Sequence, residues 1–111
     1  MTLKRSEQLY EKTADLCRLL ANPVRLRIVH FLMDNCRGGK KGCFVFEIHK
    51  KLSLPQPYVS KHLRILEKEG VLSYRREGNK IIYSFAADNP LRDLKNFLNT
   101  CCAEAQPEEA T

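Results

Sequence analysis

Several features that define other classes of protein are missing from this sequence of 111 residues. It has no apolar run near the ~20 residues that a membrane-spanning helix needs. Its N-terminus, MTLKRSEQLYEK, turns charged too early to contain the apolar segment of a signal peptide. There is no Cys-x-x-Cys pair, so a zinc ribbon or a thioredoxin-like site has little support. These absences predict a cytoplasmic protein with no membrane partner.

Recognisable catalytic patterns are missing as well. The sequence contains no Ser/His/Asp order, no glycine-rich phosphate loop and no pair of carboxylates that stands out. Cys102 with a nearby histidine could in principle act as a nucleophile, but nothing supplies an oxyanion hole or a substrate cleft. We therefore expect a protein that is not an enzyme and that requires no cofactor.

The composition is that of a folded, basic domain. Apolar residues make up 43% of the chain and charged residues 29%, which is typical of a globular protein. The formal net charge of +6 favours an anionic partner, most commonly nucleic acid. We expect residues 1–105 to form one domain, followed by a frayed acidic tail over 106–111. The five cysteines should be thiols, since disulfides are rare in a reducing compartment.

The stretch from Leu52 to Gly70 combines a turn with an amphipathic helix. The turn is Ser53-Leu54-Pro55, and Val59, Leu63 and Leu66 then form one apolar stripe at helical spacing. The opposite face is expected to carry polar and basic side chains, namely Gln56, Tyr58, Ser60, Lys61, His62, Arg64 and Lys68. Such side chains can contact base edges and phosphates. This stretch alone fits a DNA-recognition helix and an ordinary surface helix equally well.

Further helices are expected on both sides of this stretch. A first helix covers 6–21, with an apolar face wider than one small core needs. A second covers 23–34 and begins at Asn22-Pro23, where the asparagine caps and the proline fits the first turn. A short third helix covers 44–52. A final amphipathic helix begins after Asn89-Pro90.

A β-hairpin is expected between residues 71 and 85. β-prone residues recur there with a period of two, and Gly78-Asn79 is a hairpin-turn signal. Arg75, Arg76 and Lys80 lie around this turn and should give the hairpin a basic tip. The predicted fold is mainly α with a two-stranded β-hairpin, in the order α-α-α-α-β-β-α.

This order of elements is that of a winged helix-turn-helix. The short helix and the helix after it would form the helix-turn-helix, and the second of them would enter the major groove of double-stranded DNA. The hairpin would form the wing, with its cations near phosphates or the minor groove. The predicted DNA-binding residues are Gln56, Tyr58, Ser60, Lys61, His62, Arg64, Arg75, Arg76 and Lys80.

The chain resembles the ArsR-type (arsenic-repressor-like) winged-helix transcriptional regulators. The resemblance is carried by LLANPVRLRIVHFL, LPQPYVSKHLRILEKEGVL and YRREGNKIIYSF. It implies a homodimer built through the first and last helices, which represses an operon until an inducer releases it from its operator. It also implies that Gln56, Ser60 and His62 read DNA. Pro55 departs from the serine that the family usually has there, which removes a capping hydroxyl.

Two of the inducer sites that the family resemblance implies are missing from this sequence. The arsenic and cadmium sensors of this family carry a Cys-x-Cys where this chain has Phe44 and Phe46, so that site is absent. The zinc- and nickel-type site on the last helix needs histidine, and this last helix has none.

Adjacent cysteines remain as the candidate sensor. Cys101-Cys102 resembles the vicinal pair that some arsenite sensors place near the C-terminus, and Cys17 could supply a third sulfur. Thiolates suit As(III) or a soft metal ion such as Cd(II) or Cu(I). Two alternatives stay open. The cysteines could sense by thiol redox or persulfide chemistry, or the protein could be a DNA binder with no small inducer.

Overall fold

The structure is a computed structural model that describes the backbone of residues 5–37 and 41–105, and the side chains of 7–35 and 41–99. The acidic tail expected over 106–111 lies outside the described residues. The chain divides into two compact units. One comprises residues 19–89, and the other combines residues 1–18 with residues 90–111. No helix within the described ranges is long and apolar enough to cross a membrane.

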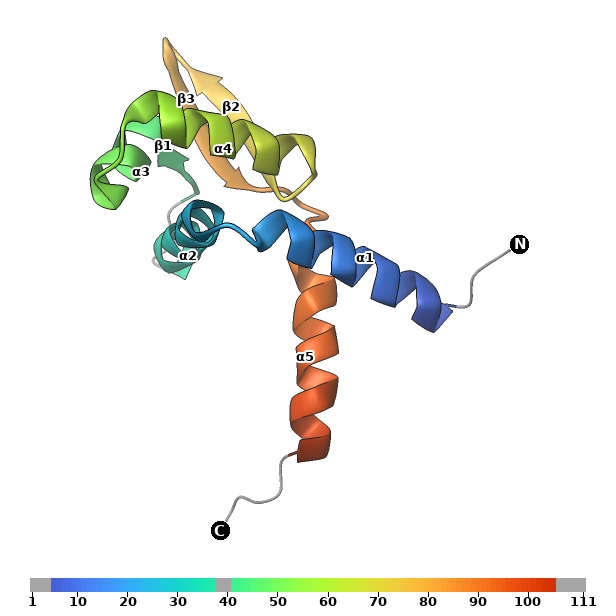
Figure 1. The fold of residues 1–111 in the computed structure, drawn as a ribbon. Coiled ribbons are helices and arrows are strands. Elements are labelled where there is room, and N and C mark those ends of the chain that lie inside the picture. Colours follow the sequence, from blue (N-terminus) through green and yellow to red (C-terminus); the bar gives the residue numbers. More distant parts are fainter. Residues whose placement is uncertain (1–4, 38–40, 106–111) are drawn as a thin grey trace. The chain divides into compact units, whose positions relative to one another are not determined.

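The unit of residues 19–89 contains the predicted winged helix-turn-helix (Figure 1). Its helices are α2 (Pro23–Arg37), α3 (Val45–Leu52) and α4 (Gln56–Lys68). Its strands are β1 (Cys43–Phe44), β2 (Leu72–Glu77) and β3 (Lys80–Phe85). The predicted fold class, mainly α with a hairpin wing, is confirmed.

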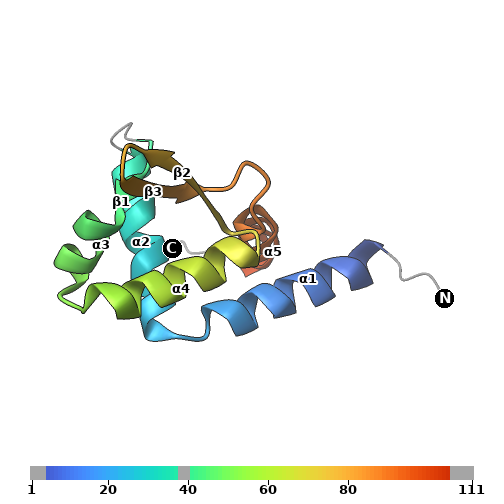
Figure 2. The same cartoon turned by 90° about the horizontal axis from the view of Figure 1, so that it is seen from above.

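Local sequence explains where the helices of this unit begin and end. Asn22 Oδ1 accepts hydrogen bonds from the backbone N–H groups of Val24, at 2.9 Å, and Arg25, at 3.2 Å, which caps α2 as predicted. Ser53 ends α3 in the left-handed conformation, with φ 57°, and its N–H donates to the Lys50 carbonyl. This tight turn leads directly into α4 (Figure 2).

The core of the unit is where α2, α3 and α4 pack together. Val59, Leu63 and Leu66 on α4 have no exposed surface, so the predicted apolar stripe is confirmed. Ile28 on α2 and Ile48 on α3 are equally buried. Each fully buried aliphatic side chain contributes about 1.5–3 kcal/mol. This burial holds α4 firmly and leaves its other face to solvent.

The sheet has three strands, in the order β1-β3-β2, where the sequence predicted two. β2 and β3 form the expected antiparallel hairpin, with Glu77 opposite Lys80 across the turn. β1 adds Cys43 opposite Tyr83 on the other side of β3. The prediction missed β1 because two residues are too few to show a period, and Phe44 was assigned to the helix after it.

Gly42 permits the close approach of β1 to β3. Its φ is +122°, and a Cβ atom there would lie 2.6 Å from the Tyr83 carbonyl oxygen and 2.9 Å from Ile82 Cγ2. Only glycine fits this combination of backbone angle and contact. The third strand therefore depends on a single residue.

The other unit is formed by most of α1 (Arg5–Leu20) and by α5 (Leu91–Ala105). The helices predicted at both ends of the chain are thus present. The ring of Tyr10 lies edge-on to that of Phe97, with 6.3 Å between the ring centroids. Tyr10 is 58% exposed and Leu98 49% exposed, so apolar surface on both helices remains accessible in the single chain.

Candidate nucleic-acid interface

The exposed face of α4 carries most of the side chains that the sequence placed there. Gln56, Tyr58, Lys61 and Arg64 are exposed, and Ser60 is half-buried. Hydrogen-bonding groups and cations therefore share one surface of a rigid helix. This combination can read base edges and neutralise phosphates.

The first turn of α4 has no side-chain cap. Pro55 occupies the N-cap position and makes no side-chain hydrogen bond, although its carbonyl accepts the Val59 N–H at 3.1 Å. Pro57 in the same turn has no N–H to donate. Amides and the helix dipole at this end favour an anion such as a phosphate. The start of α4 thus has no side-chain cap where the usual serine of the family would supply one.

His62 does not share this exposed face, so its predicted position was wrong. It is only 4% exposed, and its Nδ1 accepts a hydrogen bond from Arg25 Nε at 3.2 Å. Tyr58 lies edge-on to the imidazole, with 5.0 Å between the ring centroids. His62 follows Val59 by three residues and precedes Leu66 by four, which places it beside the apolar stripe. The sequence predicts His62 on the face opposite the apolar stripe, and the family resemblance implies that it reads DNA; the structure instead buries it.

Arg25 is the residue of this site that sequence reasoning missed. It reaches His62 from α2, and its Nη1 also donates to the Leu19 carbonyl at 2.9 Å. Arg25 and Arg27 both lie near the start of α2, and nothing local in the sequence distinguishes Arg25. Burial, the Arg25 guanidinium and the Lys61 ammonium all lower the pKa of His62. The guanidinium can only donate, so Nδ1 is the acceptor of this hydrogen bond, and the lowered pKa favours the neutral imidazole.

The cations of the wing lie on the strands and not in the turn itself. Arg75 and Arg76 are neighbours in β2, so their side chains point to opposite faces of the sheet. Arg75 already interacts within the protein. Its Nη1 donates to the Lys41 carbonyl at 3.2 Å, and its Nε lies 3.5 Å from a carboxylate oxygen of Glu77. Lys80 begins β3, directly after the turn. The wing thus offers cations on two faces.

The proposed sensor cysteines are only partly described. Cys17 on α1 is exposed, whereas Cys43 on β1 is fully buried. Cys101 and Cys102 belong to α5, but their side chains lie outside the described part of the chain. Where side chains are described, no group of three or more His, Cys, Asp or Glu residues could hold a metal ion. The thiolate site remains a prediction.

A tight helix-turn-helix, an exposed polar and basic face on its second helix and a basic wing together define a winged-helix DNA-binding protein. Known proteins agree with this class. The family model described as "bacterial regulatory protein, arsR family" matches residues 22–74. Over 85 residues the chain is 37% identical to MJ1325 of Methanocaldococcus jannaschii, an HTH-type transcriptional regulator; the match covers 77% of this chain and 89% of MJ1325. The chain therefore belongs to the arsR family of transcriptional regulators.

Two further relatives are similar over most of this chain. SmtB of Mycobacterium tuberculosis, an HTH-type transcriptional repressor, is 38% identical over 79 residues, which are 71% of this chain and 54% of SmtB. The transcriptional regulator HlyU of Vibrio vulnificus has a crystal structure that matches with a TM-score of 0.68 and 28% identity, over 92% of this chain and 100% of HlyU. At least one relative is much longer than this chain, which spans only 18% of MJ1398 of M. jannaschii.

Proposed function

We propose that this protein is a dimeric, sequence-specific transcriptional repressor that binds operator DNA and is released from it by an inducer. The main support for this proposal is the exposed face of α4. There Gln56, Tyr58 and Ser60 can read bases, and the cations Lys61 and Arg64 lie beside them. Repression, as opposed to activation, is supported by the description of SmtB as a repressor. A DNA partner would place the protein in the cytoplasm.

Phosphate binding would be shared between α4 and the wing. Lys61 and Arg64 flank the base-reading residues, and Arg76 and Lys80 extend the positive surface along the hairpin. Arg75 already binds groups within the protein, so we expect it to contribute less than Arg76. Each phosphate that a cation neutralises releases a counterion, which makes binding depend on salt.

The dimer would form through α1 and α5. Both helices expose apolar side chains, among them Tyr10 and Leu98, that a second copy could bury. A two-fold dimer would present two copies of α4 to half-sites about one helical turn apart, roughly 34–36 Å. The operator should therefore be a pseudo-palindrome.

The inducer would act at Cys101 and Cys102, with Cys17 as a third sulfur, and arsenite or a soft metal ion is the favoured class. Thiol redox or persulfide chemistry at the same residues is the second candidate. All three residues fall in the unit that contains α1 and α5. Chemistry there would act on the proposed dimer interface and thereby on the spacing of the two α4 helices.

Titration of the operator complex tests both parts of the proposal. Selected operator DNA should bind with an affinity that falls steeply as salt rises, whereas affinity independent of salt would refute the DNA interface. Arsenite, Cd(II), Zn(II) and polysulfide are then added to the complex formed by wild type, Cys101→Ser and Cys102→Ser. Cys43→Ala is the matched control, since it removes a buried thiol outside the proposed sensor. Release that survives both serine substitutions would eliminate the cysteine site.

A further inference from the structure

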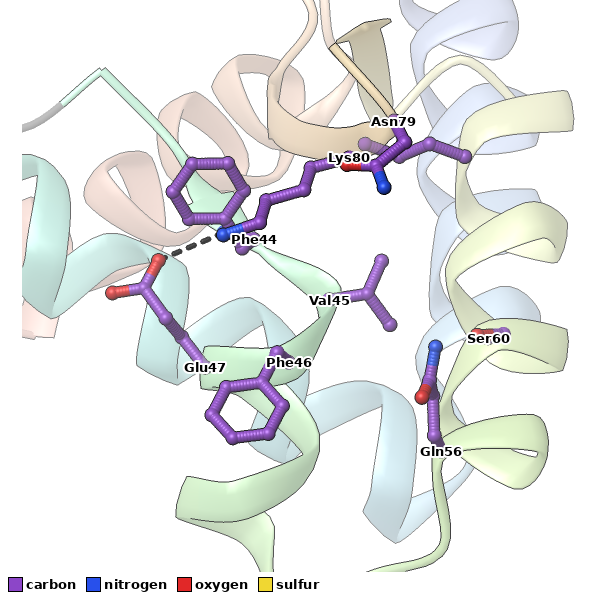
Figure 3. Close-up of a pocket in the computed structure, with 9 residues that line it drawn as sticks. Phe44, Val45, Phe46, Glu47, Gln56, Ser60, Asn79 and Lys80 are labelled. Atoms are coloured by element: carbon purple, nitrogen blue, oxygen red, sulfur yellow. Dashed lines mark hydrogen bonds between the residues drawn. The ribbon is translucent and has the colours of Figure 1, made fainter. Parts of the chain in front are cut away.

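A pocket of about 480 Å³ lies between the N-terminal ends of α3 and α4 and the turn of the wing (Figure 3). All the residues that line it belong to the unit of residues 19–89. Its volume falls within the range of roughly 300–1,000 Å³ that is typical of small-molecule sites. The pocket is therefore large enough for an organic ligand, and it lies beside the proposed DNA-reading surface.

One part of the lining is aromatic and aliphatic. Phe44 and Phe46 contribute their rings, and Val45 and Ile81 add aliphatic surface. Phe46 is 61% exposed, which is unusual for a large apolar side chain at a pocket. The lining contains no cysteine or methionine. Without sulfur, this site suits an apolar ligand body better than a metal.

The other part of the lining is polar, with Lys80 as its cation and Glu47 as its anion. Gln56 and Ser60 reach it from α4, and Lys80 from the wing. The Lys80 Nζ atom lies 5.2 Å from the centroid of the Phe44 ring. Outside the lining, the Lys50 Nζ atom lies 5.5 Å from the centroid of the Phe46 ring. Each ring therefore has an ammonium group close by, and a ligand that stacks on a ring would meet positive charge.

Glu47 is the acidic residue in this lining, and its carboxylate already makes a hydrogen bond within the protein. Its Oε1 atom accepts the backbone N–H of Phe44 at 2.8 Å, at the start of α3. A carboxylate so held serves as a helix cap and points to no cationic ligand. Lys80 and the amide and hydroxyl groups of the lining therefore remain to bind a ligand, and they suit an anion.

We propose that this pocket binds a planar aromatic carboxylate, whose ring packs on Phe44 and Phe46 and whose carboxylate pairs with Lys80. Gln56, Ser60 and Lys80 also belong to the proposed DNA surface, so a bound carboxylate and operator DNA exclude each other. This second step rests on the proposed function, whereas binding of the carboxylate does not. The protein would then respond to an organic anion independently of its cysteines.

Calorimetric titration with 1-naphthoate tests the pocket without DNA. The full chain should bind one naphthoate per protomer, and 1-naphthalenemethanol, which keeps the rings but lacks the charge, should bind at least about tenfold more weakly. Phe46→Ser should weaken naphthoate binding by a similar factor. Leu26→Ser is the matched control, because Leu26 is a 51% exposed apolar residue outside the lining. Absent binding, equal binding of the neutral probe, or equal losses in the two variants would overturn the proposal.

The effect on DNA is measured separately. Saturating naphthoate should lower the operator affinity of the wild type at least about tenfold and should leave that of Phe46→Ser unchanged, since Phe46 is outside the DNA-binding set. Naphthoate that binds without lowering operator affinity would refute mutual exclusion. A protein that binds no operator under any condition would refute the proposed function, and the calorimetric result would still decide the pocket.

Discussion

The hydrogen bond between Arg25 and His62 makes a prediction that can be worked through in free energy. It joins a charged donor to a buried acceptor, a class of bond that stabilises by about 1.5–3 kcal/mol. The Nε–Nδ1 distance of 3.2 Å lies at the long end of the normal range, so we expect a value near the lower limit, about 1.5 kcal/mol. This bond ties α4 to α2 through residues 37 positions apart.

A double-mutant cycle isolates this free energy. Arg25→Met keeps the aliphatic stem but also loses the hydrogen bond to the Leu19 carbonyl. His62→Ala adds a cavity. The cycle cancels both effects, because each of them is the same in a single variant and in the double variant. The free energies of unfolding of wild type, both single variants and the double variant are measured in urea. Their coupling should be about 1.5 kcal/mol. A coupling below about 0.5 kcal/mol, the usual limit of additivity, would refute the bond as a stabilising link.

The burial of His62 beside the positive charges of Arg25 and Lys61 also predicts how stability depends on pH. The folded state lowers the pKa of His62, so the unfolded chain binds the proton more readily. Stability from the neutral imidazole is therefore fully present above the ordinary pKa of 6.5 and declines as pH falls below it. His62→Gln keeps an acceptor that cannot titrate, and its stability should lose that part of the decline. An identical pH profile in His62→Gln would contradict this assignment.

Three further predictions follow from the fold and the charged surfaces. Gly42→Ala should destabilise the protein by about 1–3 kcal/mol in urea unfolding, because its Cβ would meet the backbone of β3, whereas Gly78→Ala in the open hairpin turn should cost less. Arg76→Gln should reduce the slope of log affinity against log salt by about 1 for each protomer and weaken all DNA sequences alike, while Lys12→Gln on α1 should leave the slope unchanged. Leu63→Ala should cost about 2–5 kcal/mol, because it leaves a cavity under α4; a loss below 1 kcal/mol would contradict its full burial.

The link through His62 also bears on how Tyr58 is oriented. Arg25 fixes the imidazole, and the imidazole lies edge-on to the Tyr58 ring on the exposed side of α4. The aromatic side chain proposed to contact bases is thus supported by a residue of α2. His62 is therefore placed to support the Tyr58 ring, and its burial leaves little of it accessible for the direct DNA contact that its position in the sequence predicted.

Local patterns in the sequence determined most of the elements. The spacing of Val59, Leu63 and Leu66 predicted both α4 and its buried stripe, because side chains three and four residues apart share one face of a helix. Asn22 predicted the start of α2, because its side chain accepts a hydrogen bond from Val24, only two residues later. Gly78 with the residue after it predicted the hairpin turn. Each of these signals depends on neighbours within a few residues, which the sequence displays directly.

Only the tertiary structure decided what depends on distant partners. The two-residue strand β1 exists because β3, about 40 residues later, pairs with it, and Gly42 allows that approach. His62 is buried because α2 supplies Arg25 as its partner. The pocket beside Phe46 is made by three separate segments, none of which shows a ligand-binding pattern alone. Contacts between residues far apart in the sequence produce no periodic pattern in it. These contacts decide which polar side chains of a helix are exposed to solvent and which are buried against a neighbouring helix.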